Sequence, residues 1–492
     1  MTKEVKIKID EKEFTVPSNW TVIKACHENG VDVPHYCYHP DLSIAGNCRI
    51  CMVGVKGAPR PVVACAQPIT DGMEVTTKGK DVEEARKSVM EFMLINHPLD
   101  CPECDQAGEC KLQDYSYEYG RDHGRFHEEK VTKSKATMGP HVKYWGSRCI
   151  VCTRCVRFTD EVSGTKELGV IYRGDRSEIA LFPGETLDNP LSLNTVDICP
   201  VGALVSSDFL FQSRVWNLHS APSVCADCSV GCNTRVDMDA KSTIKRINPR
   251  RNDDVNKEWI CDYGRLSFPY VQENRLMKPM VDGKDAMYKD AKKNAAALLS
   301  KPGAVVLVSA WNTNETFAAI KENIVKNFPN VKIAGYANSG RADEVFPGFT
   351  IKGDKNPNRA GLKEILGIDA DASLAELAVD KSPISSLLLI HNIANYVVTP
   401  MLQAVLDRTE NVILMDFAKS DLLKYGNVSV ALPTLTSFEK SGTFVNFNGI
   451  HQAFVPVMEP VNFGRSEVEI LQDIAKESKD SQSKANEKVM AK

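Results

Sequence analysis

Residues 97–110 read HPLDCPECDQAGEC, which places one histidine and three cysteines at the spacing H-x3-C-x2-C-x5-C. The candidate ligands are His97, Cys101, Cys104 and Cys110. A histidine this close to a three-cysteine loop indicates a metal site, and an imidazole in place of one thiolate would raise the reduction potential of an iron–sulfur cluster held there. Three cysteines with water, or a zinc site of the same residues, are the alternatives.

A second cysteine group lies downstream, in CIVCTRC at residues 149–155 and in DICPVGAL at residues 197–204. Its candidate ligands are Cys149, Cys152, Cys155 and Cys199. A C-x2-C-x2-C run completed by a distant cysteine and a proline is the way in which ferredoxins bind a [4Fe–4S] cluster. Zinc is a minor alternative here, because its ligands rarely form three cysteines at two-residue gaps.

Upstream, four cysteines follow the spacing C-x10-C-x2-C-x13-C, and these are Cys37, Cys48, Cys51 and Cys65. The loop contains GNCRIC at residues 46–51, where a small residue lets backbone N–H groups approach the cluster sulfides. The strand-rich surroundings favour a ferredoxin-type [2Fe–2S] loop, although the plant-type C-x4-C-x2-C spacing is not met. A zinc site stays open as an alternative.

The last group has the spacing C-x2-C-x3-C-x28-C and consists of Cys225, Cys228, Cys232 and Cys261. This spacing suits zinc as well as a [4Fe–4S] cluster. Of the four groups, we expect this one to have a structural role or to lie off the main electron path.

The 16 cysteines are used up almost completely by these sites, because only Cys26 is left over. It lies in an apolar helical stretch and is expected to be a buried free thiol. The N-terminus shows no signal-peptide pattern, so we expect a cytosolic chain whose cysteines bind metal rather than form disulfides. A net charge of −4 argues against a broad nucleic-acid surface, and no apolar run is long enough for a transmembrane helix.

The predicted fold class is α+β and multidomain, with short strands around the first cysteines and a helical pattern after residue 80. Beyond residue 276, short apolar strands alternate with helical stretches, which predicts a parallel α/β layer. The predicted boundaries are 1–79, 80–120, 121–217 and 218–275 for four cluster domains, 276–474 for the α/β domain, and 475–492 for a disordered tail rich in Lys, Ser, Glu and Asp.

The order of these four ligand groups resembles the G subunit of bacterial NADH–quinone oxidoreductase, the respiratory complex I, over residues 1–275. The resemblance implies a β-grasp [2Fe–2S] ferredoxin domain at the first group and [4Fe–4S] clusters at the other three, giving one [2Fe–2S] and three [4Fe–4S] clusters. It also implies that the fourth cluster lies away from the main chain of clusters. The segment ALPTLTSFEKSGTFVNFNGIHQ at residues 431–452 resembles the molybdopterin oxidoreductase fold. Because no cysteine follows Cys261, we expect a shortened remnant of that fold without molybdopterin.

As a subunit of a proton-translocating oxidoreductase, the chain is implied to pass electrons from an NADH-oxidising flavoprotein towards quinone. The implied partners are that flavoprotein, a thioredoxin-like [2Fe–2S] subunit and other hydrophilic-arm subunits, at the cytoplasmic face of the inner membrane. Membrane contact would come only through partner subunits. The chain has no dinucleotide fingerprint and no P-loop, so no independent active site is expected.

Four alternatives remain at this point. The chain could serve an NAD-linked hydrogenase, although its small diaphorase subunit would end soon after Cys199. An iron-only hydrogenase would need further cysteines after Cys261, and a formate dehydrogenase would need a residue that ligates molybdenum. A zinc-stabilised scaffold protein is the non-redox alternative.

Overall fold

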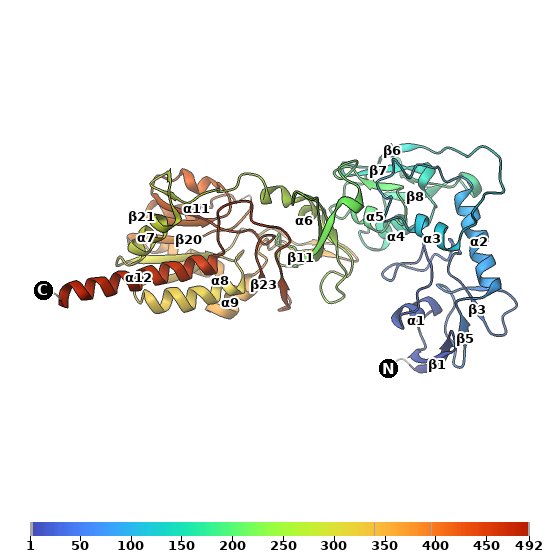
Figure 1. The fold of residues 1–492 in the computed structure, drawn as a ribbon, viewed down its shortest axis with the longest axis horizontal. Helices are drawn as coiled ribbons and strands as arrows, with labels where there is room; N and C mark the ends of the chain where they lie inside the picture. Colours follow the sequence, from blue (N-terminus) through green and yellow to red (C-terminus); the bar gives the residue numbers. More distant parts are fainter. Residues whose placement is uncertain (1–2, 339, 395, 491–492) are drawn as a thin grey trace. The chain divides into compact units, whose positions relative to one another are not determined.

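A computed structural model describes residues 3–338, 340–394 and 396–490 of the chain (Figure 1). It divides into two compact units. The N-terminal unit runs to Leu218 and includes Phe346–Phe349, and the C-terminal unit contains His219–Val345 and Thr350–Lys492. Among the described residues, no helix is both long enough and apolar enough to cross a membrane.

The N-terminal unit begins with a mixed five-stranded sheet in the order β2-β1-β5-β3-β4. The strands are β1 (Glu4–Ile9), β2 (Lys12–Pro17), β3 (Met52–Val55), β4 (Val62–Val63) and β5 (Glu74–Thr76). β1 and β2 form an antiparallel hairpin, while β1 pairs with β5 in parallel. Helix α1 (Val22–Glu28) buries Ile23 and Cys26 in the core of this sheet. The arrangement agrees with the expected ferredoxin-type domain.

Helix α2 (Lys80–Leu94) carries the chain from this sheet to the histidine-containing loop. Its buried face is formed by Val82, Arg86 and Met90, and Arg86 donates to the carbonyl oxygen of Met52 in β3 at 2.9 Å. Phe92 is 72% exposed, so the apolar stripe of the helix continues onto the surface. Helix α3 (Lys111–Tyr119) follows directly after the loop.

The rest of the N-terminal unit surrounds the Cys149 region with short elements. A three-stranded antiparallel sheet contains β6 (Lys135–Thr137), β7 (Val142–Trp145) and β10 (Leu204–Ser206). The remaining elements are α4 (Arg154–Glu161), the hairpin β8 (Leu168–Ile171) and β9 (Glu178–Leu181), and α5 (Asn194–Asp197). Helix α5 ends before Cys199, as expected from the proline that follows this cysteine.

The C-terminal unit opens with a three-stranded antiparallel sheet and a short helix. The sheet is formed by β11 (His219–Val224), β12 (Asn233–Met238) and β13 (Ile244–Pro249), and the helix is α6 (Asp262–Leu266). The loop between β11 and β12 carries three cysteines of the last group, and α6 follows the fourth.

A seven-stranded sheet in the order β15-β14-β22-β21-β20-β16-β17 forms the centre of the C-terminal unit. Its strands are β14 (Met280–Val281), β15 (Lys284–Asp285), β16 (Ala304–Ser309), β17 (Lys332–Tyr336), β20 (Ile384–Ile390), β21 (Thr409–Asp416) and β22 (Val428–Pro433). The five strands from β22 to β17 are parallel, which confirms the parallel α/β layer expected from the sequence.

Both faces of this sheet are covered, because alternate residues of each strand enter two different cores. Val306 and Leu388 join one core with helices α7 and α12, while Leu307 and Leu389 join the other with α10 and α11. Such double burial explains the continuous apolar runs of these strands. The helices are α7 (Tyr288–Leu299), α8 (Asn314–Ala319), α9 (Arg359–Leu366), α10 (Ala370–Val379), α11 (Pro400–Asp407) and α12 (Glu467–Met490), and the two small hairpins are β18 (Glu344–Val345) with β19 (Thr350–Ile351) and β23 (Gly442–Val445) with β24 (His451–Phe454).

The C-terminal segment differs from the expected disordered tail of residues 475–492. Helix α12 begins at Glu467 and continues to Met490, so most of that segment is helical (Figure 1). Ile470, Leu471 and Ile474 are fully buried and fix the start of the helix against the sheet. The polar composition after residue 475 gave no sign that the helix continues from these buried residues. Residues 491–492 lie outside the described part of the chain.

Candidate metal-cluster sites

The first cysteine group is buried at the edge of the N-terminal sheet, beside β3 and β4. Cys37, Cys51 and Cys65 have no exposed surface, and Cys48 is 4% exposed. The sulfur atoms interact with one another, because hydrogen bonds from the thiols of Cys48 and Cys65 lower the pKa of Cys37. Four converging thiols that are shielded from solvent fit a metal centre with four thiolate ligands, such as a [2Fe–2S] cluster or a zinc ion.

Backbone N–H groups stabilise the negative charge of thiolates at this site. The N–H of Cys37 lies 3.4 Å from the Cys48 sulfur, and the amides of Asn47 and Cys48 also lower the pKa of the Cys37 thiol. Gly46 has a φ of +63°, which lets the loop turn without the steric cost that a side chain would bring. Backbone donors therefore reach the thiol, as the small residue in the loop predicts.

The histidine-containing loop lies between α2 and α3. Cys104 and Cys110 are buried, whereas Cys101 is exposed. Burial raises the pKa of Cys110 to about 11, although the amides of Leu112 and Gln113 in the first turn of α3 oppose this. Electrostatic interactions among the three thiols show that the loop brings them into one neighbourhood.

His97 lies at the end of α2 next to charged groups of the same loop region. Burial lowers its pKa to about 4, and the nearby cations of Lys130 and Arg148 act in the same direction. The imidazole is therefore neutral near pH 7, which is the form that binds metal. Arg148, which lies just before Cys149, forms a 2.9 Å ion pair with Asp100 of the histidine-containing loop. Ligation of one cluster by His97 together with the three cysteines stays a prediction.

The third site is a small cavity that all four cysteines of the Cys149 group line. Cys149 and Cys152 lie just before α4, Cys155 in its first turn, and Cys199 after α5. The other walls are mainly apolar and include Ile179 from β9. Burial raises the pKa of Cys149, Cys152 and Cys199 to about 11, so these thiolates need a bound cation to be stable at neutral pH. An enclosed, four-thiol cavity fits a [4Fe–4S] cluster.

The last cysteine group lies entirely in the C-terminal unit. Burial raises the pKa of Cys225, Cys228, Cys232 and Cys261, and neighbouring thiols of the group raise it further at Cys225, Cys232 and Cys261. The site leaves no room for a side chain at Gly264, because an added Cβ would lie 2.8 Å from the Cys225 sulfur. The amide of Gly264 also lies 3.5 Å from the Cys261 sulfur. The residues of this site therefore fit a cluster as well.

Two arginines of α4 connect the first and third sites. The guanidinium of Arg157 donates to the carbonyl oxygens of Cys37 at 2.6 Å and Cys152 at 3.3 Å. Arg154 donates to the carbonyl oxygens of Tyr38 and Ile198. Sequence reasoning missed both side chains, although their i, i+3 spacing directly after the cysteine run places them on one helix face.

The third and second sites are joined by the segment after Cys199. The amide of Lys111 donates to the carbonyl oxygen of Pro200 at 3.2 Å, and the Cys110 sulfur lies 3.9 Å from the same oxygen. An added Cβ on Gly202 would come within 2.2 Å of the Cys104 sulfur, so this glycine permits a close approach. The third site is therefore in contact with segments of both other sites, which the order along the sequence does not reveal.

Family models match almost the whole chain in successive segments. They are a 2Fe-2S iron-sulfur cluster binding domain (residues 2–80), the NADH-ubiquinone oxidoreductase-G iron-sulfur binding region (86–125), the ferredoxin-like domain of NADH-quinone oxidoreductase subunit 3 (139–205), an NDSU1/NuoG-like 4Fe-4S domain (219–269) and molybdopterin oxidoreductase (271–477). These matches confirm the predicted fold class and the molybdopterin oxidoreductase-like region.

Curated relatives point in the same direction. The G subunit of NADH-quinone oxidoreductase from Rickettsia conorii is 42% identical over 62% of this chain and 46% of its own length. The mitochondrial NADH dehydrogenase [ubiquinone] iron-sulfur protein 1 of Solanum tuberosum is 42% identical over 65% of this chain and 45% of its own length. The resemblance to the G subunit is confirmed, and the chain spans less than half the length of these relatives.

Proposed function

We propose that this chain is an electron-relay subunit of an NADH–quinone oxidoreductase. The single observation that carries the proposal is the set of three ligand groups in the N-terminal unit, whose segments are joined by contacts of Arg154, Arg157 and Gly202. The curated relatives that are 42% identical to this chain are named as a G subunit of NADH-quinone oxidoreductase and an iron-sulfur protein of NADH dehydrogenase [ubiquinone]. Iron–sulfur clusters, when bound, each exchange single electrons.

The proposed path runs from the first group through the third to the second, because the third site contacts segments of both other sites. Residues of the chain would hold the clusters, exclude water and set their potentials through ligand type, backbone donors and nearby charge. At the second site, Cys101 is exposed while its partners are buried, which would leave this end accessible to an electron acceptor.

The proposed donor is an NADH-oxidising flavoprotein, with a thioredoxin-like [2Fe–2S] subunit and other hydrophilic-arm subunits as neighbours. The chain would lie at the cytoplasmic face of the membrane and contact it only through those partners. Co-purification from the native host tests this arrangement, and the recovery of hydrogenase subunits in place of quinone-reducing membrane subunits would contradict it.

We further propose that the molybdopterin oxidoreductase-like region binds no pterin. No cysteine follows Cys261 to ligate molybdenum. A cavity beside the last cysteine group is lined by Trp311, Asn392 and Lys440. Lys440 is fixed there by two 2.7 Å contacts to Glu467. Elemental analysis for molybdenum and tungsten tests the proposal, and one equivalent of either metal would refute it.

Metal content separates the relay from a zinc scaffold. After anaerobic purification, we expect iron and acid-labile sulfide in the amounts that one [2Fe–2S] and three [4Fe–4S] clusters require. Zinc without sulfide would contradict the relay.

The ligand role of His97 has its own test. Replacing His97 by Cys should keep the cluster but lower its reduction potential, because a thiolate adds negative charge. His141→Cys is the control. This histidine lies 2.9 Å from Asp208 and belongs to none of the four candidate ligand groups. Redox titration followed by EPR measures the midpoints, and an unchanged midpoint in His97→Cys would argue against ligation.

A further inference from the structure

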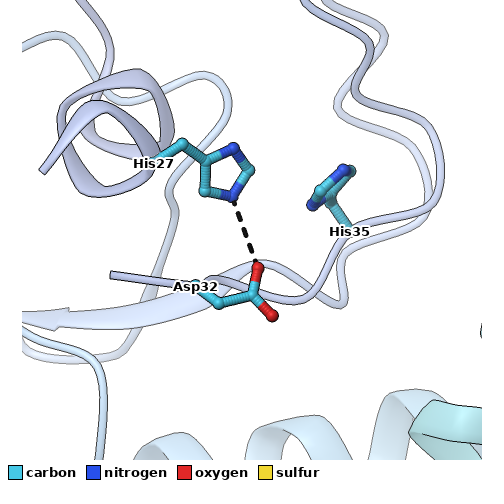
Figure 2. A group of neighbouring side chains, drawn as sticks. All are labelled: His27, Asp32 and His35. Atoms are coloured by element: carbon cyan, nitrogen blue, oxygen red, sulfur yellow. Dashed lines mark ion pairs between the residues drawn. The ribbon is translucent and has the colours of Figure 1, made fainter. Parts of the chain in front are cut away.

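Two histidines and an aspartate outside the four cysteine groups come together next to the N-terminal sheet (Figure 2). His27 lies in the last turn of α1, and Asp32 and His35 lie on the loop that follows. Figure 2 shows the His27 ring and the Asp32 carboxylate facing each other, with the His35 ring beside them. One potential ligand atom of each side chain lies within 4.8 Å of the other two.

A backbone oxygen lies close to both imidazoles of this group. Nδ1 of His35 is 2.9 Å and Nε2 of His27 is 3.4 Å from the carbonyl oxygen of Val33. The same Nε2 atom lies 3.8 Å from Oδ1 of Asp32. Ligand atoms around a tetrahedral zinc ion with bonds of ~2.1 Å are about 3.4 Å apart. The 3.8 Å between Nε2 of His27 and Oδ1 of Asp32 is close to that spacing, and all three ligand atoms lie within 4.8 Å of one another.

Both imidazoles pack against an aromatic ring, whereas the carboxylate is largely exposed to solvent. The ring of Tyr38 packs edge-on against His27 and His35, with centroid separations of 6.1 and 5.6 Å. The side chain of His27 is 27% exposed and that of Asp32 is 79% exposed. An ion could therefore enter from the solvent side, meet two nitrogen ligands and be closed in by the aspartate.

We propose that His27, Asp32 and His35 bind a divalent transition-metal ion of the Zn²⁺ class. Two imidazoles and one carboxylate suit such an ion, whereas Mg²⁺ and Ca²⁺ prefer oxygen ligands alone. The ion would tie the end of α1 to the loop that leads to Cys37 two residues later. The bound ion would thus stabilise the loop that carries Cys37, although the ion itself would not contact the first cysteine group.

Equilibrium dialysis of the cluster-loaded full chain against Zn²⁺, followed by elemental analysis, tests the site. We expect one additional zinc per chain, with iron and sulfide unchanged. Asp32→Ala and His27→Ala should each weaken zinc binding by about tenfold or more, since each removes one ligand of the set. Asp32 is the safer substitution, because its exposed side chain does not contribute to the core.

His141→Ala is the matched control, because it removes an imidazole that also faces an aspartate, Asp208, but has no second histidine beside it among the described residues. This variant should bind zinc like the parent chain. Equal zinc binding by the parent and Asp32→Ala would overturn the proposal. Zinc that binds only as iron is lost would overturn it as well, because the metal would then occupy the cysteine sites.

Discussion

The two units of this protein place metal ligands in different relations to their cores. In the N-terminal unit, cysteine ligands are part of the core: Cys51 and Cys65 pack with Val53 and Val75 beneath the first sheet. In the described part of the C-terminal unit, the two cores on either side of the seven-stranded sheet contain no cysteine. Bound clusters should therefore stabilise the core of the N-terminal unit and contribute little to the two cores around the seven-stranded sheet.

The largest difference is expected in quinone reduction, when one cysteine ligand is replaced in each unit. Cys155→Ala removes a ligand at the middle of the proposed path and should abolish NADH-driven quinone reduction in the assembled complex. Cys232→Ala affects the cysteine site of the C-terminal unit and should leave that activity nearly unchanged while reducing assembly. Quinone reduction per assembled complex is the measurement, and equal losses in both variants would place the fourth site on the path.

Removing all clusters by oxidation and chelation should unfold the two units unequally. Metal binding at a structural site is itself folding free energy, on the order of 10 kcal/mol. Hydrogen exchange should therefore rise throughout residues 97–204, while amides of β20 and β21 stay protected. Loss of protection in these two central strands would show that the C-terminal core also depends on clusters.

A substitution in the core of the C-terminal unit should destabilise that unit and leave the N-terminal unit unchanged. Leu388 in β20 is fully buried, and Leu388→Ala should lower the free energy of unfolding of the C-terminal unit by about 2–5 kcal/mol. Val379→Ala is the control, since Val379 is 79% exposed and its loss should change stability by less than about 0.5 kcal/mol. Urea unfolding followed by hydrogen exchange measures both. The EPR signals of the N-terminal clusters should not change in either variant.

The last prediction concerns pH and one buried carboxyl group of the C-terminal unit. Burial raises the pKa of Asp416, at the end of β21, to about 7, although Ser420 donates to it at 2.8 Å. Between roughly pH 4, where the unfolded chain releases this proton, and pH 7, the folded state holds the extra proton. Stability should therefore fall with rising pH across that window, by up to about 1.4 kcal/mol per unit.

Asp416→Asn removes this titration while keeping a side-chain oxygen for the amide of Ala418. Relative to the parent chain, the variant should gain stability as the pH rises from about 4 to about 7 and show a constant difference above that. Urea unfolding at several pH values measures the difference. A pH-independent difference would show that Asp416 titrates alike in the folded and unfolded chains.

Much of the architecture was predictable because its signals are local. Continuous apolar runs predicted the strands at Ala304–Ser309 and Asn411–Met415, since parallel strands covered on both faces have few polar positions. Cys26 is fully buried, as expected, and burial raises its pKa to about 12. The expected disorder after residue 475 failed because three buried side chains at the start of α12 outweigh a polar composition further along.

The sequence by itself determined which residues are candidate ligands, because ligand spacing is a property of the chain. It also determined the alternation of strands and helices, because apolar periodicity is equally local. Only the tertiary structure decided which sites are neighbours, since Arg157 and Gly202 bring together segments far apart in sequence. The same holds for the histidine-containing loop: its spacing makes His97 a candidate ligand, whereas packing against Pro200 places that loop beside the Cys199 site.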